Sequence, residues 1–485
     1  MPEFHQEQYI YLAGLTHKSA LIAWGAFFFK VKGKRDDERF KLVDDNDLRH
    51  INPPRHQTMG ASSEPFGEAV VEVREAISGD LAAVGRTNTA NHVLVTGLLP
   101  DTEYTYKITI NSEEWAPGER RDWVARDDEN QGLEKSGRVY INRFRTHPHP
   151  EISTPLTFAV LGDFGTGVRK PSSSKQRQRE VAAALEQAVV EHKVRLVLTT
   201  GDNIYAATKL LDLLPIGNTG DEDDDWFFTF YQPYRYILNR VPVYPAVGNH
   251  DSGETEKSDD RKQLMDNFYL RERFASVEAD GFASIDPGLF YRFRYGADFE
   301  FLCVDTSKAS PLFGDRVFKK DKHLQFLESS LPNKEETGGP VWRIPFMHHP
   351  AYTAGPTHHN SRSIIDTLTP LFKRAGAQVV LSGHEHNFQH SCVDGINYFI
   401  TGAGSKVSLK APSRFEEAAT AAWAAEAHFL LIEGNRTQLT ITPIAEASVG
   451  NPLSSISLKD AKNQLLAAPI IISSSGKLVL AQSGD

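Results

Sequence analysis

Five short polar motifs, each directly after an apolar run, restrict the fold of this chain more than any other sequence feature. In chain order they are GDFG at 162–165, GDNIY at 201–205, GNHD at 248–251, MHHP at 347–350 and GHEH at 383–386. The preceding runs, such as TFAVL and VRLVLTT, are typical of buried strands in parallel sheets. Ligands of α/β sheets bind beyond the carboxyl ends of the strands, so we expect the five loops to meet in one crevice.

Helical periodicity between these runs completes the prediction of the fold class. Val181, Leu185 and Ala188 follow the spacing of one buried helix face. Further helices are expected over 263–274 and 363–374. The region 151–447 is therefore predicted to be α/β, in the wider sense α+β, with helices covering its sheets. Residues 448–485, which are polar and Ser-rich, are predicted to be a C-terminal extension, and the sequence assigns no role to them.

Residues 1–150 show a different pattern, which predicts an all-β sandwich and hence a separate domain. Strand-like runs occur at 8–12, 19–26, 68–73, 92–96, 105–110 and 138–144, with turn-rich stretches between them. The segment from Leu98 to Tyr104 follows an L-x-P-x-T-x-Y pattern that resembles the tyrosine corner of fibronectin type III-like domains, and Trp24 suits the core of such a domain. The proline-rich segment 146–155 is predicted to link this domain to the next.

Charge and composition narrow the classes of partner. The formal net charge of −10 argues against a general nucleic-acid binder, which needs a basic surface. No apolar run reaches the ~18 residues that would span a membrane. The first residues lack a basic segment followed by an apolar one, so we expect a cytoplasmic protein. Two cysteines are too few for a disulfide framework, which agrees with a reducing compartment.

The side chains in the five motifs are those of a metal site. Hydrolysis of a phosphate ester requires neutralisation of the phosphoryl oxygens and a nucleophile in line with the leaving group, and two metal ions can supply both. Carboxylate, amide and imidazole ligands suit iron, zinc or manganese better than calcium. One such motif alone is usually a turn, whereas five that each end an apolar strand point to a shared site. His349 and His390 are expected to support the ligands rather than to bind metal.

The ordered motifs resemble the calcineurin-like metallophosphoesterases and, within them, the purple acid phosphatases. Tyr205 carries the finer resemblance, because the purple branch has G-D-x-x-Y where most relatives lack the tyrosine. The stretches GHEHNFQ and YFITGAGSK are similar to the small, mammalian-type enzymes, whereas a β-sandwich before the catalytic domain is similar to the plant-type arrangement. The resemblance implies a four-layer β-sandwich flanked by helices over 151–447. It also implies two-metal hydrolysis of phosphate monoesters, of the acid phosphatase type, by in-line attack of a metal-bound hydroxide.

The same resemblance implies roles for individual residues. A ferric ion would be bound by four residues: Asp163, Asp202, Tyr205 and His386. A second, divalent ion, Fe(II), Zn(II) or Mn(II), would share Asp202 as a bridge and would also be bound by Asn249, His348 and His384. His250 would hold the substrate or assist the leaving group, and His358 or His359 would face the substrate.

Three departures from the family pattern and two rival functions stay open at this stage. Pro345 stands where the family usually has valine, Asp251 replaces the glutamate of the plant-type branch, and most of the family is secreted. The first rival is a phosphodiesterase that acts on nucleotides or phospholipid-like diesters. The second rival is a binding protein with a vestigial metal domain. The sequence does not determine the physiological phosphate ester or the oligomeric state.

Overall fold

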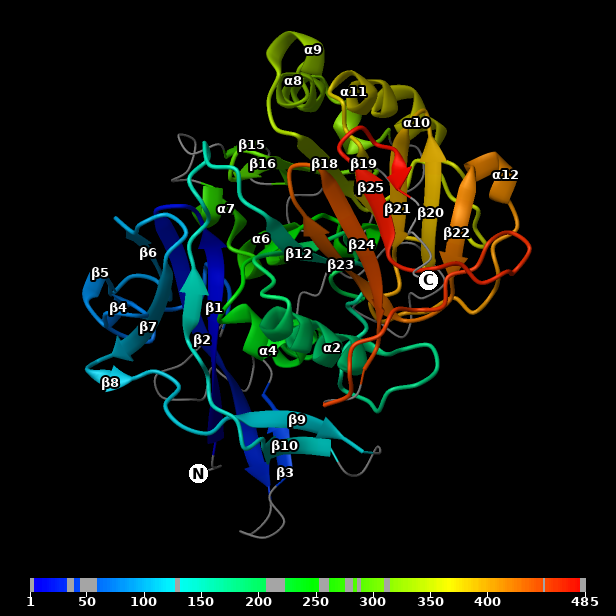
Figure 1. The fold of residues 1–485 in the computed structure, drawn as a ribbon. Helices are drawn as coiled ribbons and strands as arrows, with labels where there is room; N and C mark the ends of the chain where they lie inside the picture. The colour runs from blue at the N-terminus through cyan, green and yellow to red at the C-terminus, as the bar shows by residue number, and fades with distance from the viewer. Residues whose placement is uncertain are drawn as a thin grey trace.

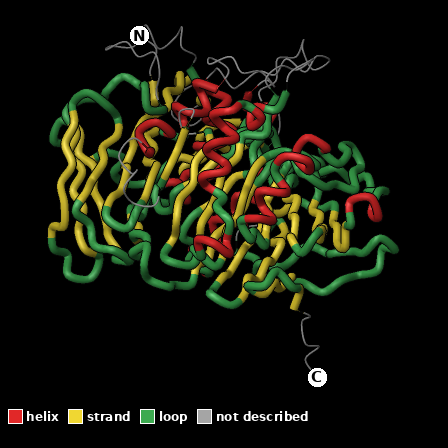
Figure 2. Tube along the Cα trace, turned by 90° about the horizontal axis from the view of Figure 1, so that it is seen from above, coloured by secondary structure: helices red, strands yellow, loops and turns green. Residues whose placement is uncertain are grey.

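A computed structural model describes most of the chain. The described residues are 4–32, 39–43, 59–126, 131–205, 223–252, 261–274, 282–285, 289–308, 315–447 and 450–479. The N-terminal part is built of strands, and the rest combines two large sheets with helices (Figure 1). Seen from above, one end of the molecule consists of strands and loops, and most helices lie in the remainder (Figure 2). This arrangement confirms the predicted α+β class.

The N-terminal strands form two sheets that face each other. In the first sheet, β2 (Ser19–Lys32) pairs with β1 (Phe4–Leu15), β3 (Arg39–Leu42) and β6 (His92–Thr96). The second sheet has the order β11 (Arg143–Arg145), β7 (Glu103–Ile110), β4 (Ala69–Glu75) and β5 (Leu81–Thr87), with β8 (Glu113–Glu114) added to β7. A separate hairpin is made by β9 (Arg121–Ala125) and β10 (Gln131–Lys135). Trp24 is buried between the sheets, and the backbone N–H of Leu99 donates to the Tyr104 hydroxyl at 2.8 Å, as in a tyrosine corner.

The β1–β2 hairpin is buried on both of its faces. Ile10 and Leu12 point into the core of the N-terminal sandwich. The alternate residues Tyr9 and Tyr11 belong to the larger core that fills the C-terminal part of the molecule. Because successive side chains of a strand point to opposite faces, one hairpin contributes to two cores.

Two mixed sheets dominate the C-terminal part. The seven-stranded sheet has the order β14 (Val243–Pro245), β13 (Val197–Thr199), β12 (Leu156–Leu161), β23 (His428–Gly434), β24 (Gln438–Ala445), β25 (Ile470–Ser473) and β26 (Leu478–Val479). The eight-stranded sheet has the order β15 (Ala283–Ile285), β16 (Phe290–Tyr295), β17 (Phe299–Val304), β18 (Trp342–Met347), β19 (Val379–Ser382), β21 (Ile396–Thr401), β20 (Phe388–Val393) and β22 (Thr420–Ala424). The rings of Phe158 on β12 and Phe301 on β17 meet edge to face at 5.2 Å, so the two sheets pack against each other.

Helices flank the paired sheets. The α-helices are α2 (Gln178–Glu191), α3 (Asp223–Trp226), α4 (Gln232–Leu238), α5 (Asn249–Ser252), α6 (Lys262–Asn267), α7 (Leu270–Phe274), α8 (Asp321–Ser330), α9 (Lys334–Thr337), α10 (Arg362–Thr367), α11 (Thr369–Arg374) and α12 (Phe415–Ala418). A π-helical turn spans Phe227–Tyr231 and a 3₁₀ turn spans Val317–Lys319. Helix α2 packs on β23 and β24, while α8 to α11 lie beside the eight-stranded sheet (Figure 1). The predicted helix–sheet–sheet–helix arrangement of a metallophosphoesterase is therefore confirmed.

The segment beyond residue 447 contributes to the seven-stranded sheet. Of this segment the structure describes residues 450–479. Strand β25 pairs antiparallel with β24, and β26 pairs with β25. The sequence had left the role of this extension open, and the strand pairing supplies one. Within the described residues, no helix combines the length and apolarity that crossing a membrane requires.

Candidate metal centre

The five motif loops leave the two sheets at neighbouring strand ends and come together. Asp163 follows β12 and Asp202 follows β13, while His348 follows β18. Contacts between the loops tie them to one another. The His384 backbone N–H donates to the Asp163 carboxylate at 2.9 Å, and the His250 backbone N–H donates to Asp202 at 2.9 Å. The motif loops therefore meet at one place, as the sequence predicted.

One group of possible metal ligands contains two aspartates. Donor atoms of Asp163, Asp202 and His386 all lie within 4.8 Å of one another. The Tyr205 hydroxyl lies 3.1 Å from Asp163 Oδ1 and 3.1 Å from His386 Nε2. These are the four residues that the sequence resemblance assigned to a ferric ion.

A second group lies on the other side of Asp202. His348, His349 and His384 each offer a nitrogen within 4.8 Å of the others. Asn249 Oδ1 is 2.9 Å from His348 Nε2, and Asp202 Oδ1 is 3.4 Å from the same nitrogen. Asp202 therefore borders both groups, as a bridging ligand would.

His349 is a member of this second group and also contacts a neighbouring loop. Its ring centroid is 4.4 Å from that of His384. Its Nδ1 is also 3.1 Å from the Thr306 hydroxyl, and its backbone N–H donates to the same hydroxyl at 3.0 Å. These contacts anchor the His349 ring to the loop after β17, in keeping with a residue that positions its neighbours.

Burial creates an electrostatic cost that cations would offset. Burial, reinforced by the charge of nearby Asp202, raises the pKa of the Asp163 carboxyl to about 8. Burial alone would raise the pKa of Asp202, but its interactions with the His348 and His250 imidazoles and with the His250 backbone N–H lower it overall. Two buried carboxylates side by side are unfavourable unless a cation lies between them.

The imidazoles in the centre are held in the form that binds metals. Burial, with the nearby histidines, lowers the pKa of His384 well below its ordinary value. Burial and the Lys406 ammonium lower the pKa of His386 to about 4. The His348 Nδ1 lies 2.8 Å from the Thr200 carbonyl oxygen, which fixes the proton on Nδ1 and leaves Nε2 facing the centre. Neutral imidazoles with directed lone pairs, facing carboxylates, fit two metal ions.

The backbone is strained at the motif residues. Asp163, Asp202 and His384 all adopt left-handed φ values, of 54°, 50° and 71°. Such values cost of order 1–3 kcal/mol each in non-glycine residues and occur mainly at functional sites. The backbone strain is therefore located at the residues whose side chains must converge on the centre.

Two glycines of the motifs leave no room for a side chain. A Cβ on Gly248 would stand 2.1 Å from Asp202 Oδ1, and one on Gly383 would stand 2.3 Å from Asp163 Oδ2. Such distances are far below van der Waals contact. The glycines are therefore needed because the carboxylates pass directly over the backbone.

Sequence reasoning overlooked the residues that hold the loops. Buried Asp251 accepts hydrogen bonds from the backbone N–H of Gly248 at 2.7 Å and from the Asn203 amide at 2.8 Å. Burial and the charge of Asp202 raise the pKa of Asp251 to about 8. Asp251 and Asn203 both lie inside the motifs. A buried polar side chain needs a hydrogen-bond partner, so their place in buried loops could have indicated that they hold the loops together.

The histidines expected to face the substrate differ in their surroundings. The His250 side chain is 42% exposed, and its Nε2 is 4.0 Å from Asp202 Oδ2. The His358 ring stacks on His384 with centroids 3.7 Å apart, and its Nδ1 is 3.2 Å from buried Glu385. His359 is exposed, and among the described residues no contact joins it to the donor groups. Of the pair left open by the sequence, His358 is the one that borders the centre.

Comparison with known proteins assigns this architecture to a class. Residues 156–388 match the family model described as calcineurin-like phosphoesterase. The solved structure of PhoD covers 98% of this chain and 93% of its own, with a TM-score of 0.59 and 12% identity. A purple acid phosphatase from yellow lupin seeds covers 95% of this chain and 75% of its own, with a TM-score of 0.55 and 13% identity. The region 156–388 is a calcineurin-like phosphoesterase domain, and the protein is a metal-dependent phosphoester hydrolase.

Sequence relatives narrow the assignment. Purple acid phosphatase 4 of Arabidopsis thaliana is 25% identical over 267 residues, which are 53% of this chain and 70% of that protein. Purple acid phosphatase 17 of the same plant is 22% identical over 263 residues, 52% of this chain and 69% of its own length. In this region the chain is therefore similar to the purple acid phosphatases. The similarity implies a centre of two metal ions, for which the two donor groups are the candidates.

Proposed function

We propose that this protein is an acid phosphatase that hydrolyses phosphate monoesters at a two-metal centre. A ferric ion would be held by Asp163, Asp202, Tyr205 and His386, and a divalent Fe, Zn or Mn ion by Asp202, Asn249, His348 and His384. The observation that carries the proposal is the position of Asp202 between two sets of donor atoms. When bound, two such ions would neutralise phosphoryl oxygens and lower the pKa of an attacking water.

The chain itself would supply proton transfer and orientation. His250 is partly exposed at the rim, where it could donate a proton from its imidazolium to the leaving alkoxide. His358 would bind phosphoryl oxygens through its outward nitrogen. Glu385 would hold that ring in place, since its carboxylate lies 3.2 Å from Nδ1 and accepts the His358 backbone N–H at 2.8 Å.

Residues 1–150 would act as an accessory domain. The donor groups of the centre all come from residue 163 onward, so this domain would contribute no ligand. Its strands β1 and β2 share a core with the catalytic region. Its role would therefore be to stabilise the catalytic region by packing against it.

Two measurements test the proposal. Elemental analysis after expression with excess metal should find two metal ions per chain. Hydrolysis of p-nitrophenyl phosphate should exceed that of bis(p-nitrophenyl) phosphate in kcat/KM. Preference for the diester would favour a phosphodiesterase instead, and one metal or none, with no hydrolysis of either ester, would favour a binding protein with a vestigial centre.

A further inference from the structure

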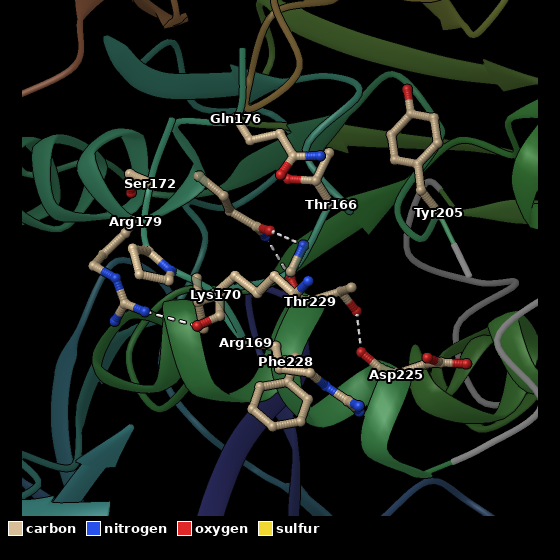
Figure 3. Close-up of a pocket in the computed structure, with 14 residues that line it drawn as sticks. Thr166, Arg169, Lys170, Ser172, Gln176, Arg179, Tyr205, Asp225, Phe228 and Thr229 are labelled. Atoms are coloured by element: carbon tan, nitrogen blue, oxygen red, sulfur yellow. Dashed lines mark hydrogen bonds between the residues drawn. The ribbon is translucent and has the colours of Figure 1, made fainter. Parts of the chain in front are cut away.

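A polar cavity lined in part by Tyr205 lies next to the metal centre. Its volume is about 470 Å³, and its walls are the loop after Asp163, the start of α2 and the turn around Phe228. Tyr205 stands at one side of this pocket with its hydroxyl pointing away from the other lining residues (Figure 3). That hydroxyl reaches Asp163 and His386 at 3.1 Å each. Tyr205 therefore borders both the pocket and the donor groups.

The pocket is cationic in an acidic protein. Its lining includes Arg169, Lys170 and Arg179, against the single carboxylate of Asp225 among the lining residues. The whole chain carries a formal charge of −10. Lys170 is exposed to the cavity and forms no ion pair with any residue that the structure describes. A local excess of positive charge beside a phosphoesterase centre favours an anionic ligand.

The walls of the pocket are fixed by internal hydrogen bonds. The buried Gln178 side chain accepts the Gly167 backbone N–H at 2.7 Å and donates to the Thr229 carbonyl at 2.6 Å. Arg179 donates to the Val168 carbonyl at 2.7 Å (Figure 3). It also donates to the Trp123 carbonyl at 3.0 Å. Backbone carbonyls satisfy the guanidinium hydrogens without cancelling the charge. Arg169 lies over the Phe228 ring at 4.5 Å, which holds its charge at the rim.

A further cation bridges the pocket and the centre. The Lys406 Nζ lies 4.7 Å from the centroid of the Tyr205 ring. The backbone of Lys406 also forms a β-bridge with Gln176, which lines the pocket. Lys406 therefore adds a positive charge beside Tyr205, which lines the pocket and contacts the donor groups.

We infer that this pocket binds a second phosphate group of the substrate, so that the preferred substrates are phosphate esters with another phosphate elsewhere on the same carbon skeleton. The inference rests on the proposed function and refines its substrate class. A phosphate dianion matches a site of lysine and arginine that is open to water, because charge-assisted hydrogen bonds to phosphate are strong. A simple aryl phosphate has no group to place there.

Matched substrates and variants test this inference. The substrates are fructose 1,6-bisphosphate, fructose 6-phosphate and p-nitrophenyl phosphate. The variant is Arg169→Gln/Lys170→Gln, with Lys107→Gln as the control, because Lys107 is an exposed lysine on β7 paired with Glu114. We expect the wild type to prefer the bisphosphate over the monophosphate, and the double variant to raise KM for the bisphosphate by roughly 10- to 100-fold. Its kcat/KM for p-nitrophenyl phosphate should change less than about twofold.

The outcomes separate this inference from the proposed function. Equal losses on all three substrates, or no preference of the wild type for the bisphosphate, would overturn the pocket's role while leaving a phosphatase. If the wild type hydrolyses none of them, the proposed function fails, and calorimetric titration with fructose 1,6-bisphosphate decides the inference alone. The double variant should then bind it at least about tenfold more weakly than the wild type and the Lys107→Gln control. Equal dissociation constants would exclude the site.

Discussion

The core of the N-terminal sandwich and the metal centre both consist of buried side chains, but burial lowers the free energy in the core and raises it in the centre. The sandwich core consists of side chains such as Ile10, Ile22 and Val71, which gain free energy as they leave water. In the centre, Asp163 and Asp202 are buried on left-handed backbone, which costs free energy through strain and desolvation. The difference teaches where a substitution acts: in the sandwich and its interface it should change stability, and in the centre it should change activity.

The largest expected effect lies in the centre. Asp202→Ala removes the carboxylate that borders both donor groups and should lower kcat/KM for p-nitrophenyl phosphate by roughly 10⁴-fold, about 5 kcal/mol of transition-state stabilisation. The melting temperature of the metal-free protein should change little, because removal of a buried charge offsets loss of the hydrogen bond that it accepts from the His250 backbone N–H. Circular dichroism and steady-state kinetics measure both. Residual activity above about one per cent would show that Asp202 is not the shared ligand.

The interface between the two regions should give the largest effect on stability. Arg235 of α4 pairs with Glu7 of β1 at 2.8 Å, and both side chains are almost fully buried. Arg235→Met should lower the free energy of unfolding by about 3–5 kcal/mol, because Glu7 is left as a buried charge that has lost its main partner. Urea denaturation measures the loss, and adding Glu7→Gln should recover much of it.

An exposed pair of the same chemistry provides the control for Arg235. Arg126 and Glu134 lie 3.0 Å apart on the β9–β10 hairpin, with side chains 67% and 50% exposed. Arg126→Met should cost less than about 1 kcal/mol. Equal costs for the two arginine variants would mean that burial of the interface pair does not govern stability.

Acid should weaken the junction between the regions. Burial, together with nearby Arg195, lowers the pKa of His147 to about 3. Its ring packs against Tyr295 with centroids 5.0 Å apart. In the unfolded chain this histidine takes up a proton below about pH 6.5, whereas the folded protein does so only near pH 3. The unfolded state therefore binds more protons in that window, and stability falls by roughly 1.4 kcal/mol per pH unit as the pH drops from 6.5.

The variant His147→Leu should remove this dependence. Its free energy of unfolding should fall less than that of the wild type between pH 6.5 and pH 4.5, by roughly 2–3 kcal/mol. Urea denaturation at the two pH values measures the difference. His149→Leu serves as a control, because that neighbouring ring is exposed. If both variants follow the wild type, another group accounts for the acid sensitivity.

The smallest effect on turnover is expected at Tyr205. Its hydroxyl touches Asp163 and His386, so a phenolate there could bind ferric iron and give visible absorption. Tyr205→Phe, purified in air with iron, should lose the pink to violet colour of the wild type and roughly tenfold in kcat/KM. Absorbance in the visible range, where iron–phenolate charge transfer absorbs, measures the change. An active, iron-loaded wild type without such a band would contradict the ferric assignment but leave the two-metal centre in place.

Strands with one buried face were predictable, whereas exposed ones were not. The run at 92–96 is observed as β6 with the same bounds. Strand β5 was missed, because Val84 and most of its neighbours are at least partly exposed and give no apolar alternation. The expected strand at 138–144 is wrong for most of its length: β11 covers Arg143–Arg145, and the apolar Val139 and Ile141 that suggested it are exposed.

Helix periodicity located helical segments but not their breaks. The helix expected over 263–274 is split into α6 and α7 by Tyr269, whose φ of 53° no α-helix allows. The helix expected over 363–374 is split at Leu368, and Pro370 lies in the first turn of the second part. Across the second break the helical spacing persists, because Ile364, Leu368 and Phe372 are all buried.

The candidate site was more predictable than the fold around it. A glycine directly precedes Asp163, Asp202, Asn249 and His384 and marks a turn in the sequence itself, so these residues could be placed at strand ends without coordinates. The pocket behind Tyr205 could not be found this way. It combines Arg169 with Phe228, which are far apart in sequence and show no shared motif.

Strand β25 has a consequence for shortened forms of the protein. It covers the backbone edge of β24 from Gln438 to Ile441. A chain ending near residue 450 would keep every donor of the metal centre but would expose a row of unpaired N–H and C=O groups beside Leu439 and Ile441. Bare edges of this kind pair with one another in neighbouring molecules. Such a form would fail first by self-association, so the C-terminal strand protects solubility in a protein whose chemistry takes place elsewhere.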